Sequence, residues 1–382
     1  MNRFRTWLAA RTPASPLLRW HSWLLLCVLL QLGGCAQLNY YAQATHGQAS
    51  LMAAARPIDD LLLDPELAPR LRQRLLLVNQ IRQFAVDELA LPDNGTYQKY
   101  ADLHRPYALW NVVATPELSM QPLQWCFPIA GCVSYRGYYS EADAQAFAAE
   151  LRASGHDVQV MGVPAYSTLG WYKDPVLSTF VNYPDAEVAR LMIHELAHQV
   201  VYVPGDTQFN ESFATSVEEV GVARWLARSG DEQGRQSYLT AQARKQQFLA
   251  LLIQYRQKLV DNYAADRIDA VKRKAKQEIF AALQDDYQQL KTSWHGYAAY
   301  DRWFAQGLTN AHLVSVATYN GQVPAFRALL QEQHDFPGFY RAVINLAQQD
   351  KAQRDERLAS LVMALPQAVS YTHLRAHETD SY

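Results

Sequence analysis

The segment from Val188 to Val201 carries apolar residues on nearly all sides of a helix. Three of its polar side chains, those of His194, Glu195 and His198, lie close together within this apolar sequence. An apolar residue on every side is typical of a buried helix, and buried polar groups cost free energy unless a partner satisfies them. The pattern therefore predicts a buried helix whose three polar side chains share a partner, and a metal ion would serve as one.

Outside this segment the hydrophobic pattern predicts an α+β fold that is mostly helical. Apolar residues recur with helical periodicity before and after it, and the longest such stretch breaks near residues 262–266 into two long helices. Shorter apolar runs between turn signals indicate a few strands. Helices are expected over residues 69–89, 141–154 and 238–290, and strands over residues 108–113 and 157–163.

The buried helix is followed by a turn signal and then by a second helix. Pro204, Gly205 and Asp206 predict a turn that ends the first helix. The second helix is expected to begin at about Thr207, and it carries Glu211 near its start. Glu211 is therefore a candidate partner for the polar groups of the first helix.

His194, Glu195 and His198 form an H-E-x-x-H pattern. On a helix the two histidines lie one turn apart on the same face, where both imidazoles can reach one ion. A catalytic zinc site has three protein ligands and an open position for water, so we expect His194, His198 and Glu211 to bind one Zn²⁺ ion. Glu195 is the expected general base, which takes a proton from the water.

These motifs resemble those of the gluzincin metallopeptidases, the thermolysin and aminopeptidase clan. The H-E-x-x-H pattern is followed here by Asn210-Glu211-x-x-Ala214. In the gluzincins a glutamate of an N-E motif on a later helix completes the site, and the resemblance implies this role for Glu211. Twelve residues separate His198 from Glu211, fewer than in the better-known gluzincins.

The chain is also similar to a bacterial family of predicted zinc aminopeptidases. The likeness extends from about residue 37 to residue 366. It implies a zincin-like metallopeptidase domain over residues 35–368, with a small sheet beside the active-site helix and a C-terminal part of long helices. The N-lobe is expected at about 35–203 and the helical C-lobe at about 204–368. The stretches that carry the likeness, besides the two motifs, are residues 126–140, 166–180 and 309–326.

Further residues are candidates for supporting roles in such a site. Asn210 and Glu218 are expected beside the ligands. Glu218 lies two turns beyond Glu211 on the same helix face, so it could hold a ligand imidazole or recognise a free α-ammonium, and the alternative is a surface carboxylate. The resemblance also implies a Tyr or His that stabilises the oxyanion. His312 and Tyr319 are candidates for this role, with core packing as the alternative.

Binding of a peptide calls for two more features. In zincins an edge strand lies along the cleft and pairs with extended substrate, and residues 158–163 and 167–170 are candidates for that rim. A purely structural strand is the alternative. An aminopeptidase also needs an acidic group for the substrate's N-terminus, and Glu187, Glu218 and Glu219 are available.

Residues 1–34 are expected to be a lipoprotein signal peptide. Basic residues precede an apolar run over residues 23–32, which is too short to span a bilayer. Leu32-Gly33-Gly34-Cys35 resembles the bacterial lipobox, which implies cleavage before Cys35 and lipidation of its thiol. Ala36 then favours the outer membrane of a Gram-negative cell. We expect a protein of the bacterial cell envelope, lipid-anchored and facing the periplasm, with an ordinary cleaved signal peptide as the alternative.

Two remaining features concern the cysteines and the C-terminal tail. Cys126 and Cys132 are the only cysteines after Cys35. In an oxidising periplasm they predict a small disulfide loop, with free thiols as the alternative.

Residues 369–382 resemble a translated sequencing adapter, so we expect a non-native or disordered tail and assign it no function.

The motifs predict a zinc-dependent peptidase, and the resemblance implies an aminopeptidase with peptide substrates. A net charge of −2 without a basic patch argues against nucleic-acid binding. The alternatives are an endopeptidase or cell-wall peptide hydrolase, or a non-catalytic envelope lipoprotein with a structural zinc. Structural zinc sites usually have four ligands rich in cysteine, which argues against the last of these. The oligomeric state is not predicted.

Overall fold

The computed structural model describes residues 38–127, 131–314 and 321–363. The expected signal peptide (1–34), Cys35, Tyr319 and the tail (369–382) lie outside the described residues. The chain forms two compact units, Met1–Ser50 and Leu51–Tyr382. The described part of the first unit, residues 38–50, is helical. None of the described helices is both long enough and apolar enough to cross a membrane.

The second unit is an α+β structure in which helices predominate, as the hydrophobic pattern predicts. The predicted helix over 69–89 is α3 (Pro69–Leu89), and Pro69 stands at its first position, where its missing N–H costs nothing. The predicted helix over 141–154 is α4 (Glu141–Ala153). Ser140 caps α4, because its hydroxyl accepts a hydrogen bond from the backbone N–H of Asp143.

A three-stranded antiparallel sheet has the order β6–β3–β7. Its central strand is β3 (Leu109–Pro116), which pairs with β6 (Arg136–Tyr138) and β7 (His156–Val163). The predicted strands over 108–113 and 157–163 correspond to β3 and β7. Helix α4 packs on β3 and β7, and β7 is an edge strand of this sheet.

Two further sheets are small. One has the order β1–β2–β8, with β1 (Ala55–Pro57) antiparallel and β8 (Val176–Leu177) parallel to β2 (Lys99–Ala101). The other pairs β4 (Trp125–Phe127) with β5 (Gly131–Val133). A disulfide joins Cys126 and Cys132 across this pair.

Helix α5 (Asp185–Ala197) lies in the main core, packed against α3, α6 (Thr207–Ser229) and α7 (Glu232–Ala264). Its apolar side chains from Val188 to Ala197 are all buried. α6 in turn packs against α11 (Val323–Gln333). The helices that complete this core are α2 (Ile58–Leu63), α12 (Phe336–Ala347) and α13 (Lys351–Met363).

The prediction that the first helix ends at the turn of Pro204–Asp206 is wrong, because α5 ends at Ala197 with His198 as its C-cap. The Val200 N–H donates to the Ala197 carbonyl and so turns the chain away from the helix axis. Contacts with distant segments hold the turned chain. The Gln199 side chain accepts from Asn94 Nδ2 at 2.7 Å, a partner that periodicity alone does not reveal.

The long helical pattern forms α7 and α8 (Asp269–Ser293), which pack side by side. The chain leaves the helical conformation at Ala265, so the predicted break near residues 262–266 is confirmed. With α9 (Asp301–Phe304), these helices enclose a second core that is rich in aromatic rings. Its buried aromatic members are Phe248, Tyr255, Tyr287, Trp294 and Phe304.

Candidate metal centre

The candidate site lies where the end of α5 meets the start of α6. His194 and Glu195 belong to the last turn of α5, and His198 caps that helix. Glu211 lies in the first turns of α6, which begins at the predicted position. Asp206 starts α6 by accepting a hydrogen bond from the backbone N–H of Phe209 at 3.3 Å.

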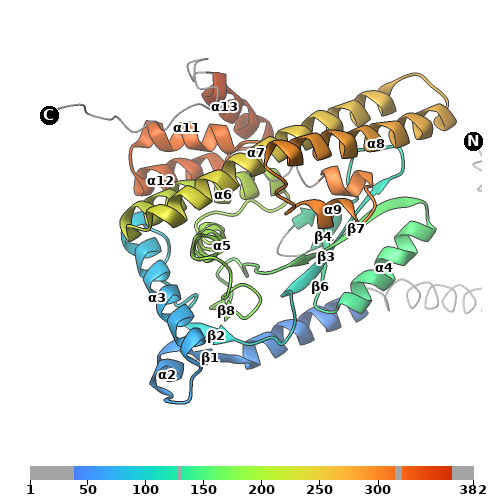
Figure 1. The fold of residues 1–382 in the computed structure, drawn as a ribbon. Coiled ribbons are helices and arrows are strands. Elements are labelled where there is room, and N and C mark those ends of the chain that lie inside the picture. Colours follow the sequence, from blue (N-terminus) through green and yellow to red (C-terminus); the bar gives the residue numbers. More distant parts are fainter. Residues whose placement is uncertain (1–37, 128–130, 315–320, 364–382) are drawn as a thin grey trace, which may run out of the picture. The chain divides into compact units, whose positions relative to one another are not determined.

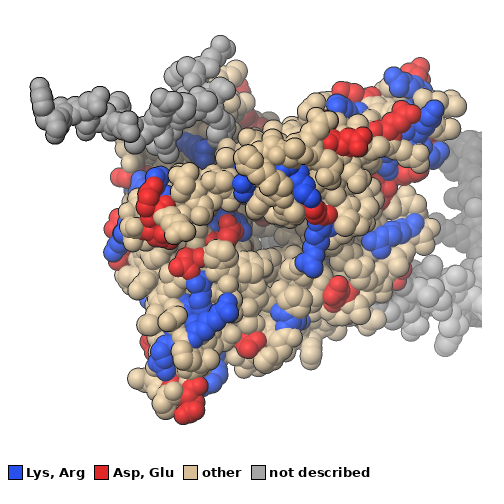
Figure 2. Space-filling view, viewed as in Figure 1, with Lys and Arg blue, Asp and Glu red and all other residues tan. Residues whose placement is uncertain are grey.

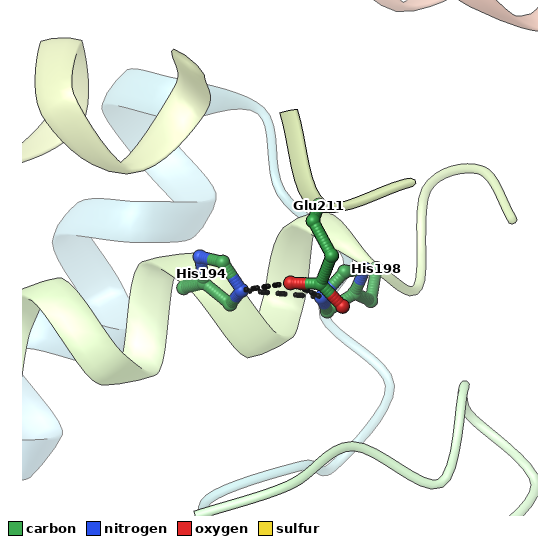
Figure 3. Close-up of side chains that lie close together, drawn as sticks. All are labelled: His194, His198 and Glu211. Atoms are coloured by element: carbon green, nitrogen blue, oxygen red, sulfur yellow. Dashed lines mark hydrogen bonds and ion pairs between the residues drawn. The ribbon is translucent and has the colours of Figure 1, made fainter. Parts of the chain in front are cut away.

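The structure brings His194, His198 and Glu211 together, so that one ligand atom from each lies within 4.8 Å of the others (Figure 3). The two imidazole Nε2 atoms are 3.2 Å apart. Glu211 Oε2 is 3.3 Å from His194 Nε2 and 3.7 Å from His198 Nε2. Ligand atoms about 2.1 Å from a tetrahedral zinc ion lie roughly 3.4 Å from one another. The separations and the donor set of two imidazoles and a carboxylate therefore fit zinc.

Glu218 holds one of these imidazoles from behind. Its Oε2 accepts a hydrogen bond from His194 Nδ1 at 2.8 Å, which leaves Nε2 to face Glu211. Arg190 approaches the same oxygen at 3.3 Å. Burial alone would raise the pKa of Glu218, but the Arg190 charge and His194 outweigh it and hold the pKa at about 2. A carboxylate behind a ligand imidazole is the usual means of orienting it.

The two histidines differ in their affinity for a proton. Burial favours the neutral form of both, and it lowers the pKa of His198 to about 4. At His194 the carboxylates of Glu211 and Glu218 outweigh burial and raise the pKa to about 10. The carboxylates thus create a place for positive charge at this point, which a proton or a metal ion can supply.

Glu195 lies beside the ligands with only 8% of its surface exposed. Burial raises the pKa of its carboxyl to about 7; His194 opposes this shift, and the charges of Glu211 and Asp174 add to it. A carboxyl group with a pKa near 7 can both accept and donate a proton near neutral pH. This is the property that a general base needs.

Sequence reasoning missed a buried group on the loop before β8. Asp174 is 6% exposed, and burial raises its pKa to about 6 in spite of hydrogen bonds from Thr168. Tyr97 is within electrostatic reach of both this group and Glu195, since burial and then the charges of the two carboxylates raise the pKa of its hydroxyl. No motif or spacing links Asp174 to Glu195, so only the folded chain reveals their proximity.

The other candidate residues have distinct places. Asn210 binds the backbone of Val203, which donates to Asn210 Oδ1 and accepts from Nδ2, both at 2.8 Å. It therefore ties down the connection between α5 and α6. His312 is buried against Trp303, and its Nδ1 accepts a hydrogen bond from the backbone N–H of Thr309 at 3.1 Å.

The surface around these elements is mixed in charge. On the face drawn in Figure 2, lysines and arginines are interspersed with acidic residues, and a hollow lies in the middle of the face.

Comparison with known proteins finds one family. The model of the family described as "Putative aminopeptidase" matches residues 39–358, which include every described residue of the site. No curated protein and no solved structure matches the chain significantly.

Proposed function

Because the chain belongs to the family described as "Putative aminopeptidase", we propose that it is a zinc-dependent peptidase that removes N-terminal residues from peptides. One observation carries the proposal: two imidazoles and a carboxylate converge on one point, with the buried carboxyl of Glu195 beside them. We further propose that the arrangement of α5, α6 and the small sheets is of the zincin type.

Each residue of the site has its own role in the proposed reaction. His194, His198 and Glu211 would hold the ion. Zinc in such a site polarises a carbonyl and lowers the pKa of water to about 7. Glu195 takes the proton from the attacking water and returns it to the leaving amine. Glu218 fixes the ring of His194 in the orientation that directs Nε2 toward Glu211.

We also propose that the protein is anchored to the bacterial outer membrane through a lipid on Cys35 and faces the periplasm. The lipobox-like Leu32-Gly33-Gly34-Cys35 supports this location. The disulfide between Cys126 and Cys132 is consistent with an oxidising compartment.

The test uses zinc-loaded protein from Ala36 to Ala368 and matched peptides with free and acetylated N-termini. The parent should cleave only the free peptides. Glu195→Gln should lower the rate about 10²- to 10⁴-fold, since a positioned base contributes that much, while its zinc content stays unchanged. His194→Ala should lose both zinc and activity.

Three outcomes would contradict the proposal. A Glu195→Gln variant as active as the parent would remove the assigned base. Equal cleavage of acetylated and free peptides would point to an endopeptidase. Cleavage of neither peptide by zinc-loaded protein would favour a non-catalytic role for the site.

A further inference from the structure

The loop that carries Asp174 lies against the end of the helix that bears the two histidines. At Gly170 an added Cβ would lie 3.8 Å from Asn94 Nδ2 and 4.0 Å from Gln199 Oε1. Gln199 directly follows His198, and its Oε1 accepts a hydrogen bond from Asn94. The tip of the loop, Asn94 and Thr96 therefore all lie beside Gln199, the residue that follows the candidate ligand His198.

The loop is closed by its own hydrogen bonds. Thr168 donates its backbone N–H to Asp174 Oδ2 at 2.9 Å and its hydroxyl to Oδ1 at 2.8 Å. The Trp171 N–H donates to the Thr168 carbonyl at 3.0 Å. Between them Leu169 and Gly170 have φ values of 56° and 81°. A leucine at positive φ is strained, and such strain persists where the surroundings impose one conformation.

Asp174 is joined to the site through Tyr97. The Tyr97 N–H donates to the Asp174 carbonyl at 2.8 Å. The phenol of Tyr97 is 2% exposed and lies within electrostatic reach of both Glu195 and Asp174. The exposed fraction of Asp174, 6%, is close to that of His198 (7%) and Glu195 (8%), so this carboxylate is enclosed to the same degree as the groups of the site.

The charge of Asp174 has no positive partner among the described residues, since its interactions are with Thr168, Tyr97, Tyr166 and Glu195. The other acidic candidates for binding an N-terminus are already paired with arginines. Arg190 contacts Glu187 at 2.7 Å and Glu218 at 3.3 Å, and Arg327 contacts Glu219. A buried carboxylate without a cation is costly, and a positively charged ligand would remove that cost.

We propose that Asp174 is the carboxylate that binds the free α-ammonium of the peptide substrate. The inference rests on the proposed peptidase function and deepens it. Thr168 occupies one lone pair on each oxygen of Asp174 and fixes its orientation, so the other lone pairs remain for a substrate. An acetylated N-terminus carries no charge and gains nothing from Asp174. Asp174 is therefore the residue that makes the enzyme selective for free N-termini.

The experiment compares Asp174→Asn with the parent on free and acetylated peptides of one sequence. Asp174→Asn should lower kcat/KM for the free peptide roughly 10- to 150-fold, the contribution of a hydrogen bond to a charged group. It should leave kcat/KM for the acetylated peptide unchanged. Glu219→Gln removes a partly buried carboxylate that is paired with Arg327, and as the matched control it should keep the full preference for the free peptide.

A binding measurement gives a second readout that does not depend on turnover. In the Glu195→Gln background, calorimetry with the same two peptides should show weaker binding of the free peptide when Asp174→Asn is added. Asp174→Glu, which keeps the carboxylate, should recover part of the preference. Thr168→Val loosens the loop but keeps the charge of Asp174, and it should retain most of the preference.

The experiment distinguishes a failure of the proposed aminopeptidase function from a failure of the role of Asp174. If the parent cleaves neither peptide, or both equally, the proposed aminopeptidase function fails, and the role of Asp174 fails with it. If the parent prefers the free peptide and Asp174→Asn prefers it equally, only the role of Asp174 is overturned. Equal loss of preference in Asp174→Asn, Asp174→Glu and Thr168→Val would show that Asp174 merely shapes the loop, and would also overturn the inference.

Discussion

The carboxylates between α5 and α6 and the single carboxylate of Asp174 are satisfied in opposite ways. Between α5 and α6, Glu218 binds His194 and Arg190, and Glu211 lies against both histidines. On the loop before β8, the Asp174 carboxylate accepts two hydrogen bonds from the neutral Thr168, and no other described residue donates to it. The first group is electrostatically complete around a point that can hold a cation. Among the described residues Asp174 has no cation beside it, which suits a group that binds a charged ligand.

The largest expected consequence of this contrast is a pH dependence of stability at Asp174. Its folded-state pKa, about 6, lies above the ordinary value of 3.8, so the folded chain binds this proton more tightly than the unfolded chain. The free energy of unfolding should therefore fall by about 3 kcal/mol as the pH rises from about 4 to about 6, at 1.36 kcal/mol per pKa unit.

Urea unfolding of the parent and of Asp174→Asn at several pH values between 4 and 8 tests this. The free energy of unfolding of the parent, measured relative to that of Asp174→Asn, should fall as the pH rises through this window and stay constant above it. Comparison with Asp174→Asn cancels the contribution of the histidine cluster, which both proteins share. A difference that does not vary with pH would mean that Asp174 is not desolvated in the folded protein.

A smaller effect is expected where the carboxylate is already paired. Glu218→Gln keeps a hydrogen-bond acceptor for His194 Nδ1 but removes the charge that orients the ring and favours a cation. Zinc affinity should fall about tenfold to hundredfold, as for other groups behind ligand histidines. Competition with a chelator of known affinity measures this. Glu219→Gln, one residue further along α6, should leave the affinity unchanged, and an equal loss in both variants would contradict the role of Glu218.

The smallest effect concerns the strained turn of the loop. Leu169→Gly relieves a left-handed backbone that costs a leucine about 1–2 kcal/mol, but it adds freedom to the unfolded chain worth about 0.5–1 kcal/mol. We expect a net stabilisation of at most about 1.5 kcal/mol, the difference between these two contributions. Gly170→Ala should destabilise the protein by about 1 kcal/mol because its φ of 81° is unfavourable for alanine. A steric clash adds nothing, since the added Cβ would lie no closer than 3.8 Å to another atom.

Thermal unfolding of the two loop variants checks the opposite signs. A destabilised Leu169→Gly would show that the leucine side chain, which is half-buried, contributes more by packing than its backbone costs.

Local signals predicted the ends of several helices. α3 begins and ends at the predicted residues Pro69 and Leu89, and α6 begins at Thr207 as expected. Pro69 at a first helical position and Asp206 at an N-cap are effects of neighbouring residues, so they are visible in the sequence. The end of α5 was predicted wrongly; there the Gln199 side chain contacts Asn94, which is far away in the chain and which no local pattern indicates.

The sequence by itself determined which residues can form the metal centre. His194 and His198 must share a helix face, and Glu211 must follow on the next helix after a short turn, because helix geometry and chain length leave little choice. Of the three possibilities for Glu218, its place behind His194 was decided only when α5 packed against α6.

Asp174 shows what only the tertiary structure could decide. Its proximity to Glu195 arises because β8 pairs with β2 and the Tyr97 N–H donates to the Asp174 carbonyl, contacts between segments that are far apart in the chain. Hydrophobic periodicity indicates which residues are buried, but not which buried residues contact one another. The charge environment of a carboxylate depends on those contacts. The sequence therefore predicted the candidate metal ligands, and the fold revealed a buried carboxylate with no positively charged partner among the described residues.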